Sequence, residues 1–210
     1  MKISRDRLQK IEIGEITMKI FIISGYSCAG KSTVIEALKK LKDYDILKFG
    51  TIHKETVKNN GYDFAKNWIK EKGFKPYEEQ LLLHFSNKIS KCDRDSIIII
   101  DGLFSYKCFE FLRQIPGIEI INIVLKTDAE VRKHRMMQRE KMDYETASGH
   151  LLRTDCIKER AGLSKILNNS DYIIDGNETP EKILMRCLGI IHDAQRRKDE
   201  LENNEDIGKI

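Results

Sequence analysis

The residues from Gly25 to Thr33 have the types and spacing of a loop that binds a chain of phosphates. They read Gly-Tyr-Ser-Cys-Ala-Gly-Lys-Ser-Thr and fit the pattern G-x-x-x-x-G-K-[ST] at every fixed position. The two glycines permit a close backbone approach that a Cβ would obstruct. The Lys31 ammonium can bridge two phosphates, and the Ser32 hydroxyl can complete the oxygen shell of Mg²⁺. The sequence therefore predicts binding of a nucleoside triphosphate.

The segments on either side of this loop predict the geometry that it needs. A strand at 19–24 leads into the loop, and an amphipathic helix at 31–42 leaves it. The backbone N–H groups of the loop and the positive end of the helix then point at the phosphates. We expect contacts with the nucleotide from Gly25, Ser27, Cys28, Ala29, Gly30, Lys31, Ser32 and Thr33.

A second oxygen ligand for Mg²⁺ is expected from Asp101. This residue ends the continuous β-branched run Ile97–Ile100, which is typical of a central strand buried on both faces. Ligands of open α/β sheets bind at the carboxyl edge of the strands, where Asp101 would lie beside the loop. We therefore predict Ser32 and Asp101 as metal-binding residues.

The remaining chain alternates apolar runs with longer amphipathic segments, which predicts a parallel sheet covered by helices on both faces. Strands are expected at 19–24, 45–49, 96–101, 119–125 and 171–175. Helices are expected at 31–42, 76–90, 128–141, 144–167 with a break near Gly149 or Gly162, and 180 to about 198.

Composition limits the class of protein. Hydrophobic residues make up 40% of the 210, which is enough for a buried core. No apolar run approaches the roughly 20 residues that span a bilayer, and the charged N-terminus has no apolar core of a secretory signal. Five scattered cysteines without a CxxC pair indicate a reducing, cytoplasmic location. The net charge of +4 comes from 37 basic and 33 acidic residues, so nucleic acid is not an expected partner.

Arginines gather in the segment that follows the fourth expected strand. Arg132, Arg135 and Arg139 share one helix face, and Arg153 and Arg160 follow on the next helix. Guanidinium groups meet the charge of a transferring phosphoryl group with paired donors, and two helices can close over it as a lid that excludes water. We predict Lys31, Asp101, Arg135, Arg139 and Arg153 as catalytic residues.

These motifs, in this order, resemble the adenylate-kinase-like nucleotide kinases, including dephospho-CoA kinase-like and nucleoside monophosphate kinase-like proteins. The resemblance extends from Lys19 to about Leu188 and includes the segments 49–55, 100–102, 125–139 and 171–177. It implies a P-loop NTPase fold of three layers, with a five-stranded parallel sheet, an acceptor-binding helical insert at about 51–91 and a lid at about 132–160. The core domain would span 18–201. The extension at 1–17 would precede it, and would be absent if translation started at Met18. A polar tail at 202–210 would follow it.

The acceptor side departs from this family. The chain has Gly50-Thr51 and then Lys54 where the family often has Gly-Asp and an arginine, and Phe104 stands where an arginine is frequent. Lys54 is the predicted acceptor-binding residue, but lysine lacks the forked donors of arginine. The aromatic residues of the insert (Tyr62, Phe64, Trp68, Phe74 and Tyr77) either stack on the acceptor or pack the insert.

Together these features predict a phosphotransferase that uses ATP and Mg²⁺ and acts, as a monomer or homodimer, on a small acceptor. Acceptors left open are a nucleoside monophosphate, a nucleoside or a dephospho-CoA-like compound. The alternative is a regulatory NTPase or switch with slow hydrolysis. The segment Leu125-Lys126-Thr127-Asp128 supports it only weakly, because a guanine-specific motif would begin with asparagine or threonine. A kinase of nucleic-acid ends is disfavoured by the lack of a concentrated basic and aromatic patch.

Overall fold

The computed structural model describes residues 18–42, 44–93 and 96–207. Its centre is an all-parallel sheet with the strand order β2-β3-β1-β4-β5. The strands are β1 (Met18–Ser24), β2 (Asp45–Lys48), β3 (Ile97–Asp101), β4 (Ile118–Lys126) and β5 (Tyr172–Asp175). This is the sheet that the sequence predicted, with ends that differ by one residue at most. The expected extension at 1–17 lies outside the described residues.

Nine helices accompany the sheet within the described residues. They are α1 (Lys31–Leu41), α2 (Phe49–Asn59), α3 (Ala65–Lys72), α4 (Phe74–Ile89), α5 (Tyr106–Arg113), α6 (Ala129–Glu140), α7 (Tyr144–Arg160), α8 (Leu163–Asn168) and α9 (Pro180–Ile207). The expected break near Gly149 or Gly162 occurs at Gly162, which has a left-handed backbone with φ of 93°. Helix α9 continues past the expected end, because the segment after Lys198 contains neither glycine nor proline up to Gly208.

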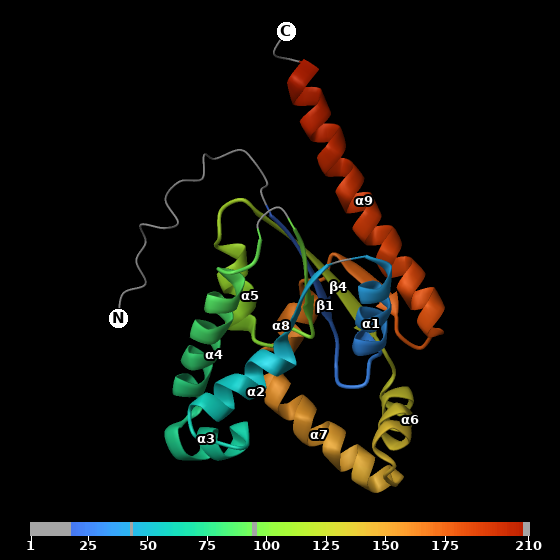
Figure 1. Ribbon diagram of the computed structural model, residues 1–210. Helices are drawn as coiled ribbons and strands as arrows, with labels where there is room; N and C mark the ends of the chain where they lie inside the picture. The colour runs from blue at the N-terminus through green and yellow to red at the C-terminus, as the bar shows by residue number, and fades with distance from the viewer. Residues whose placement is uncertain (1–17, 43, 94–95, 208–210) are drawn as a thin grey trace.

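The alternation of side chains along the central strands divides the core into two layers. Ile20 and Ile22 of β1 pack with the layer that contains α2, α4, α5 and α8, whereas Phe21 and Ile23 pack with α1 and α9. Figure 1 shows these helices on either side of the sheet. The sheet is therefore buried on both faces, which explains its continuous apolar sequence.

The insert between β2 and β3 is helical, as expected, and consists of α2, α3 and α4. Its aromatic residues form a common core: Trp68 is 3% exposed and stacks on Tyr62 at 5.6 Å between ring centroids, and Tyr77 is fully buried. Phe64 is the exception, with 61% of its surface exposed. Of the two interpretations of these residues, packing therefore explains Trp68 and Tyr77.

Helices α6 and α7 form the segment that the sequence predicted as a lid. They have a small core of their own, made by Met136, Ala147 and Leu151, and Cys28 of the phosphate loop packs against it. This contact joins the lid to the loop. Among the described helices, none is long and apolar enough to cross a membrane.

Candidate functional site

The phosphate loop connects the end of β1 to the start of α1, as the motif predicted. Gly25 and Gly30 have φ of 147° and 102°, which residues with a side chain rarely adopt. A Cβ at Gly25 would stand 2.8 Å from the Leu125 carbonyl oxygen, so a side chain is excluded by contact as well. Cys28 also has a positive φ, of 61°. The backbone of the loop is therefore shaped as a cradle.

The Lys31 side chain folds back over this cradle. Its Nζ donates hydrogen bonds to the carbonyl oxygens of Gly25 at 2.8 Å and Tyr26 at 2.7 Å. Burial of the ammonium, and then the nearby charge of Lys158, lower the pKa of Lys31 to about 7. Because neutral carbonyls hold this cation, its positive charge is available to the oxygens of a phosphate.

Asp101 lies at the carboxyl edge of the sheet, where it was expected. In the register it pairs with Ile23 of β1 and Lys48 of β2. Burial raises the pKa of its carboxyl group, against the lowering effect of Lys31 and other nearby lysines. Ser32 follows Lys31 in the first turn of α1 and is exposed. A carboxylate and a hydroxyl are oxygen donors of the kind Mg²⁺ prefers, so these residues fit the ion chemically.

A cavity of about 460 Å³ opens beside the second half of the loop. Arg135 from α6 forms one wall, and its guanidinium donates to the carbonyl oxygens of Gly176 at 2.8 Å and Cys28 at 3.4 Å. These two bonds fix the plane of the guanidinium. The other lining residues are Cys28, Ala29, Gly30, Lys31, Ser32, Thr33, Val34, Gln138, Arg139, Pro180 and Ile183. This volume lies in the usual range of small-ligand sites.

The segment Leu125–Asp128 does not form part of this cavity. The Thr127 hydroxyl donates to the Ala29 carbonyl oxygen at 3.1 Å, and the backbone N–H of Asp128 donates to Asn177 Oδ1 at 3.0 Å. Neither Lys126 nor Asp128 lines the cavity. This segment therefore supports the loop, and it does not favour guanine recognition.

The predicted arginines and lysine do not all meet at the loop. Arg135 and Arg139 line the cavity, and Arg139 also contacts Glu140 and the Met136 sulfur. Arg153 is exposed on α7 and does not line the cavity. Lys54 is exposed on α2. Arg160 lies over the Phe74 ring of the insert, at 4.8 Å from its centroid.

Helix α7 instead presents three other side chains to the first half of the loop. Lys158 Nζ donates to Ser27 Oγ at 2.8 Å, and the Ser27 N–H donates to Asp155 Oδ1 at 3.4 Å. The Tyr26 hydroxyl donates a hydrogen bond to Glu159 Oε1 at 2.5 Å. Burial lowers the pKa of Lys158. Asp155, Lys158 and Glu159 are spaced three and four apart and share one helix face, and this spacing is visible in the sequence.

Arg132 of α6 completes this network. Its Nη1 lies 2.6 Å from Asp155 Oδ2 and 3.3 Å from the Ser27 carbonyl oxygen, and its guanidinium carbon stands 4.9 Å from the centre of the Tyr26 ring. The sequence placed Arg132 correctly on the face of Arg135 and Arg139. Its partner Asp155, however, is 23 positions away and could not be foreseen from spacing.

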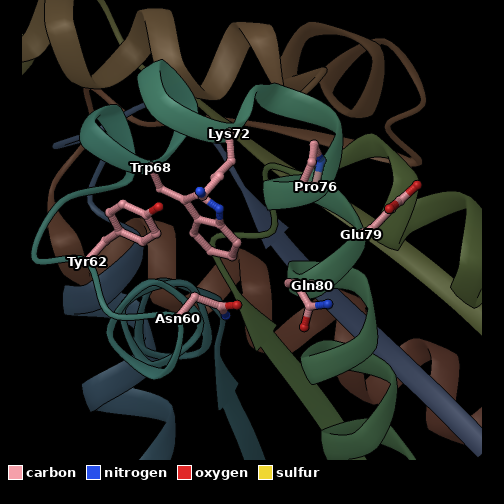
Figure 2. A pocket seen from close by; sticks show the side chains of 7 residues that line it. All are labelled: Asn60, Tyr62, Trp68, Lys72, Pro76, Glu79 and Gln80. Atoms are coloured by element: carbon pink, nitrogen blue, oxygen red, sulfur yellow. The ribbon is translucent and has the colours of Figure 1, made fainter.

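A second cavity, of about 370 Å³, lies on the insert. Figure 2 shows Tyr62 and Trp68 on one side and Pro76, Glu79 and Gln80 on the other. Asn60 and Lys72 complete its lining. All seven residues belong to the insert, and none of them belongs to the phosphate loop or to the lid.

The fold and the loop define a P-loop nucleotide-binding protein with the architecture of the small kinases. Solved structures of similar fold include TT1252 from Thermus thermophilus (14% identity, TM-score 0.60, covering 84% of this chain and 97% of that one). Shikimate kinase from Bacteroides thetaiotaomicron follows with 15% identity, a TM-score of 0.55 and coverage of 83% and 98%. Dephospho-CoA kinase from Campylobacter jejuni has 17% identity, a TM-score of 0.50 and coverage of 85% and 98%. They confirm the expected fold.

The AAA domain family matches residues 21–158, and the chain belongs to that family. UPF0200 proteins from Saccharolobus islandicus strain L.S.2.15 and from Saccharolobus solfataricus are both 22% identical over 177 residues. These matches cover 82% of this chain and 92% of each relative.

Proposed function

We propose that the protein is a phosphotransferase that moves the γ-phosphoryl group of ATP, bound with Mg²⁺, to a small acceptor. The observation that carries the proposal is the buried Lys31 ammonium, held by loop carbonyls between the phosphate cradle and the carboxyl edge of the sheet. A loop with this cation, a cavity beside it and a helical insert across from it are the parts that phosphoryl transfer requires.

Each part has a role in positioning the reactants. The loop N–H groups bind the β- and γ-phosphates, and Lys31 exchanges its carbonyl partners for phosphate oxygens. Arg135, with its plane fixed by Cys28 and Gly176, forms a wall for the base in the cavity. Lys158, bonded to Ser27, supplies a second cation at the transferred group. Bound Mg²⁺, held by Ser32 and Asp101, would neutralise phosphate charge.

The lid residues would exclude water as the site closes. Arg132 and Asp155 link α6 and α7 to Ser27, so that movement of the two helices is coupled to the loop. Water near a polarised γ-phosphate would hydrolyse it, and closure suppresses that side reaction. Arg139 lines the cavity and can reach the polyphosphate, whereas Arg153 would approach only if α7 moved.

The test is ADP release from MgATP by the full chain, with and without nucleoside monophosphates, nucleosides or dephospho-CoA. Stimulation by one acceptor, with a phosphorylated product, is the expected result. Lys31→Ala should reduce this turnover by at least about 100-fold, with Lys40→Ala at the exposed end of α1 as the matched control. Equal activity of Lys31→Ala and Lys40→Ala would refute the proposal. Slow hydrolysis that no acceptor stimulates would favour the regulatory switch.

A further inference from the structure

The lid contacts every polar group of Ser27 in the phosphate loop. The backbone N–H of Ser27 donates to Asp155 Oδ1 at 3.4 Å. Its carbonyl oxygen accepts from Arg132 Nη1 at 3.3 Å, and its Oγ accepts from Lys158 Nζ at 2.8 Å. The position of Ser27 is therefore set by side chains from both lid helices, α6 and α7.

Asp155 presents an anionic oxygen to the loop in surroundings that suit a phosphate oxygen. Its other carboxylate oxygen, Oδ2, lies 2.6 Å from Arg132 Nη1, and the side chains of Asp155 and Arg132 are 15% and 13% exposed. The Lys158 ammonium bonds to the same serine. A backbone N–H flanked by a guanidinium and an ammonium attracts anions, and here Asp155 Oδ1 is the anion that it binds.

The order of the phosphates along the loop determines which of them meets Asp155. The cavity beside the loop is lined by Cys28 and the residues that follow it, up to Val34, and not by Ser27. A base in this cavity leaves the first phosphates of its chain at the start of α1, where N–H groups and the positive helix end attract them. Only the terminal phosphate of a triphosphate extends as far as Ser27, so a diphosphate ends short of Asp155.

The contact between Asp155 and Ser27 is one that a phosphate can replace. Its N···O distance of 3.4 Å is long, because such bonds usually measure about 2.9 Å. A phosphate oxygen at the usual distance forms a stronger, charge-assisted bond to the same N–H. Arg132 keeps its pairing with Oδ2 when Oδ1 leaves, so the carboxylate departs from the loop without becoming an unpaired charge.

We propose that Asp155 is an internal competitor of the γ-phosphate and thereby determines how strongly the loop distinguishes a nucleoside triphosphate from a nucleoside diphosphate. This property belongs to the nucleotide site of the phosphotransferase proposed above and rests on that proposal. A diphosphate binds while α7 keeps its contact with Ser27. A triphosphate takes the Ser27 N–H and releases α7 from it, and the contact returns once the γ-phosphoryl group has been transferred.

Equilibrium titrations with fluorescent analogues of ATP and ADP, each with Mg²⁺, test this competition in the full chain. Asp155→Ala removes the competitor, so it should tighten binding of the ATP analogue by about tenfold and change binding of the ADP analogue by less than about twofold. Glu159→Gln removes a charge from the same helix face and keeps an oxygen for the Tyr26 hydroxyl. It therefore separates loss of charge from loss of the contact with Ser27, and it should alter both affinities by less than about threefold.

The outcomes separate this proposal from the proposed function. Unchanged or weaker binding of the ATP analogue to Asp155→Ala would overturn the competition and leave the phosphotransferase standing. An equal change for both analogues, or the same tightening in Asp155→Ala and Glu159→Gln, would have the same meaning. If neither analogue binds to the wild type or to Asp155→Ala, both proposals are wrong.

The wild type alone provides a second measurement. Because α7 must leave Ser27 before the γ-phosphate takes its place, the observed rate of binding of the ATP analogue should reach a plateau as the analogue concentration rises. The rate for the ADP analogue should keep rising linearly. Stopped-flow mixing over the same concentration range records both rates. A linear rate for the ATP analogue, or a plateau of the same height for both analogues, would mean that Asp155 does not compete with the γ-phosphate.

Discussion

Replacing Lys31 with methionine should make the nucleotide-free protein more stable while it removes triphosphate binding. The Lys31 residue is 9% exposed, and burial with the charge of Lys158 lowers its pKa from 10.5 to about 7. The folded state therefore disfavours the charged ammonium relative to the unfolded chain. Methionine has a similar length and no charge, so it occupies the same space without this cost.

The size of the effect follows from the pKa difference. One pKa unit corresponds to about 1.4 kcal/mol, so keeping Lys31 in the fold costs at most about 4 kcal/mol at pH 7.5. Methionine loses the hydrogen bonds to the carbonyl oxygens of Gly25 and Tyr26, and it leaves Asp101 with one cation fewer. After these losses we expect a net gain of about 2 kcal/mol in the free energy of unfolding.

The sign of the pH dependence gives a second, independent check. Because the folded pKa of Lys31 is depressed, its contribution to stability is fully present above pH 10.5 and is lost as pH falls through 7. Between these values the unfolded chain binds more protons at this position. As pH rises, Lys31 should therefore increase the unfolding free energy of the wild type by up to about 1.4 kcal/mol per pH unit. The Lys31→Met variant should lack this increase.

Urea unfolding at pH 7.0, 7.5, 8.0 and 8.5, followed by the fluorescence of the single tryptophan, Trp68, measures both quantities. Lys40→Met, at an exposed position of α1, is the control for the change of residue type. MgATP should raise the midpoint of the wild type and of Lys40→Met, but not that of Lys31→Met. A Lys31→Met variant that is less stable than the wild type and keeps the same pH slope would refute the reasoning.

Three further predictions concern the surroundings of the loop. Arg135→Ala should weaken binding of a fluorescent ATP analogue by about tenfold in a titration, because it removes the guanidinium that lines the cavity and is held by the Gly176 carbonyl oxygen. Arg153→Ala, outside the cavity lining, should change the affinity by less than about twofold. The wild type should lose stability as pH falls from 6.5 to about 4, where unfolded His53 is protonated and folded His53 is not; thermal unfolding of His53→Phe should show a flatter profile. Gly176→Ala should lower the melting temperature, since its Cβ would stand 3.1 Å from the Ala29 carbonyl oxygen and closer still to the Thr127 hydroxyl; Gly189→Ala, which meets nothing within 4 Å in α9, should raise it.

The sheet and the phosphate loop could be predicted because their signals are local. Ile97–Ile100 is continuous and β-branched, and the strand and helix on either side of the loop are explicit in the neighbouring residues. Helix α2 could not be delimited in the same way. It begins at Phe49 immediately after β2, and no capping side chain is bonded at its start. Its apolar face is recognisable only from tertiary contacts, in which Phe49 packs against Phe85 of α4 and against Phe104.

The lid shows where helical periodicity is insufficient. Spacing correctly predicts that Arg132, Arg135 and Arg139 share a face of α6, and this face turns towards the loop. On α7 the positive charge of Arg153 led to its prediction as a catalytic residue, although the face that meets the loop carries Asp155 and Lys158. Which face of a helix turns inward depends on the small core of Met136, Ala147 and Leu151. Those residues are too few to give α7 a clear amphipathic pattern.

The two halves of the phosphate loop are therefore held by different partners, and this division bears on the order of events in the site. Arg135 and Thr127 support the second half, at Cys28 and Ala29, through carbonyl oxygens that a nucleotide does not need. In the first half, Asp155 accepts a hydrogen bond from the backbone N–H of Ser27. Backbone N–H groups of this kind bind phosphate oxygens. A triphosphate can enter the second half without disturbing its supports. Its γ-phosphate then competes with Asp155 Oδ1 for the N–H of Ser27, while Oδ2 of the same carboxylate is paired with Arg132.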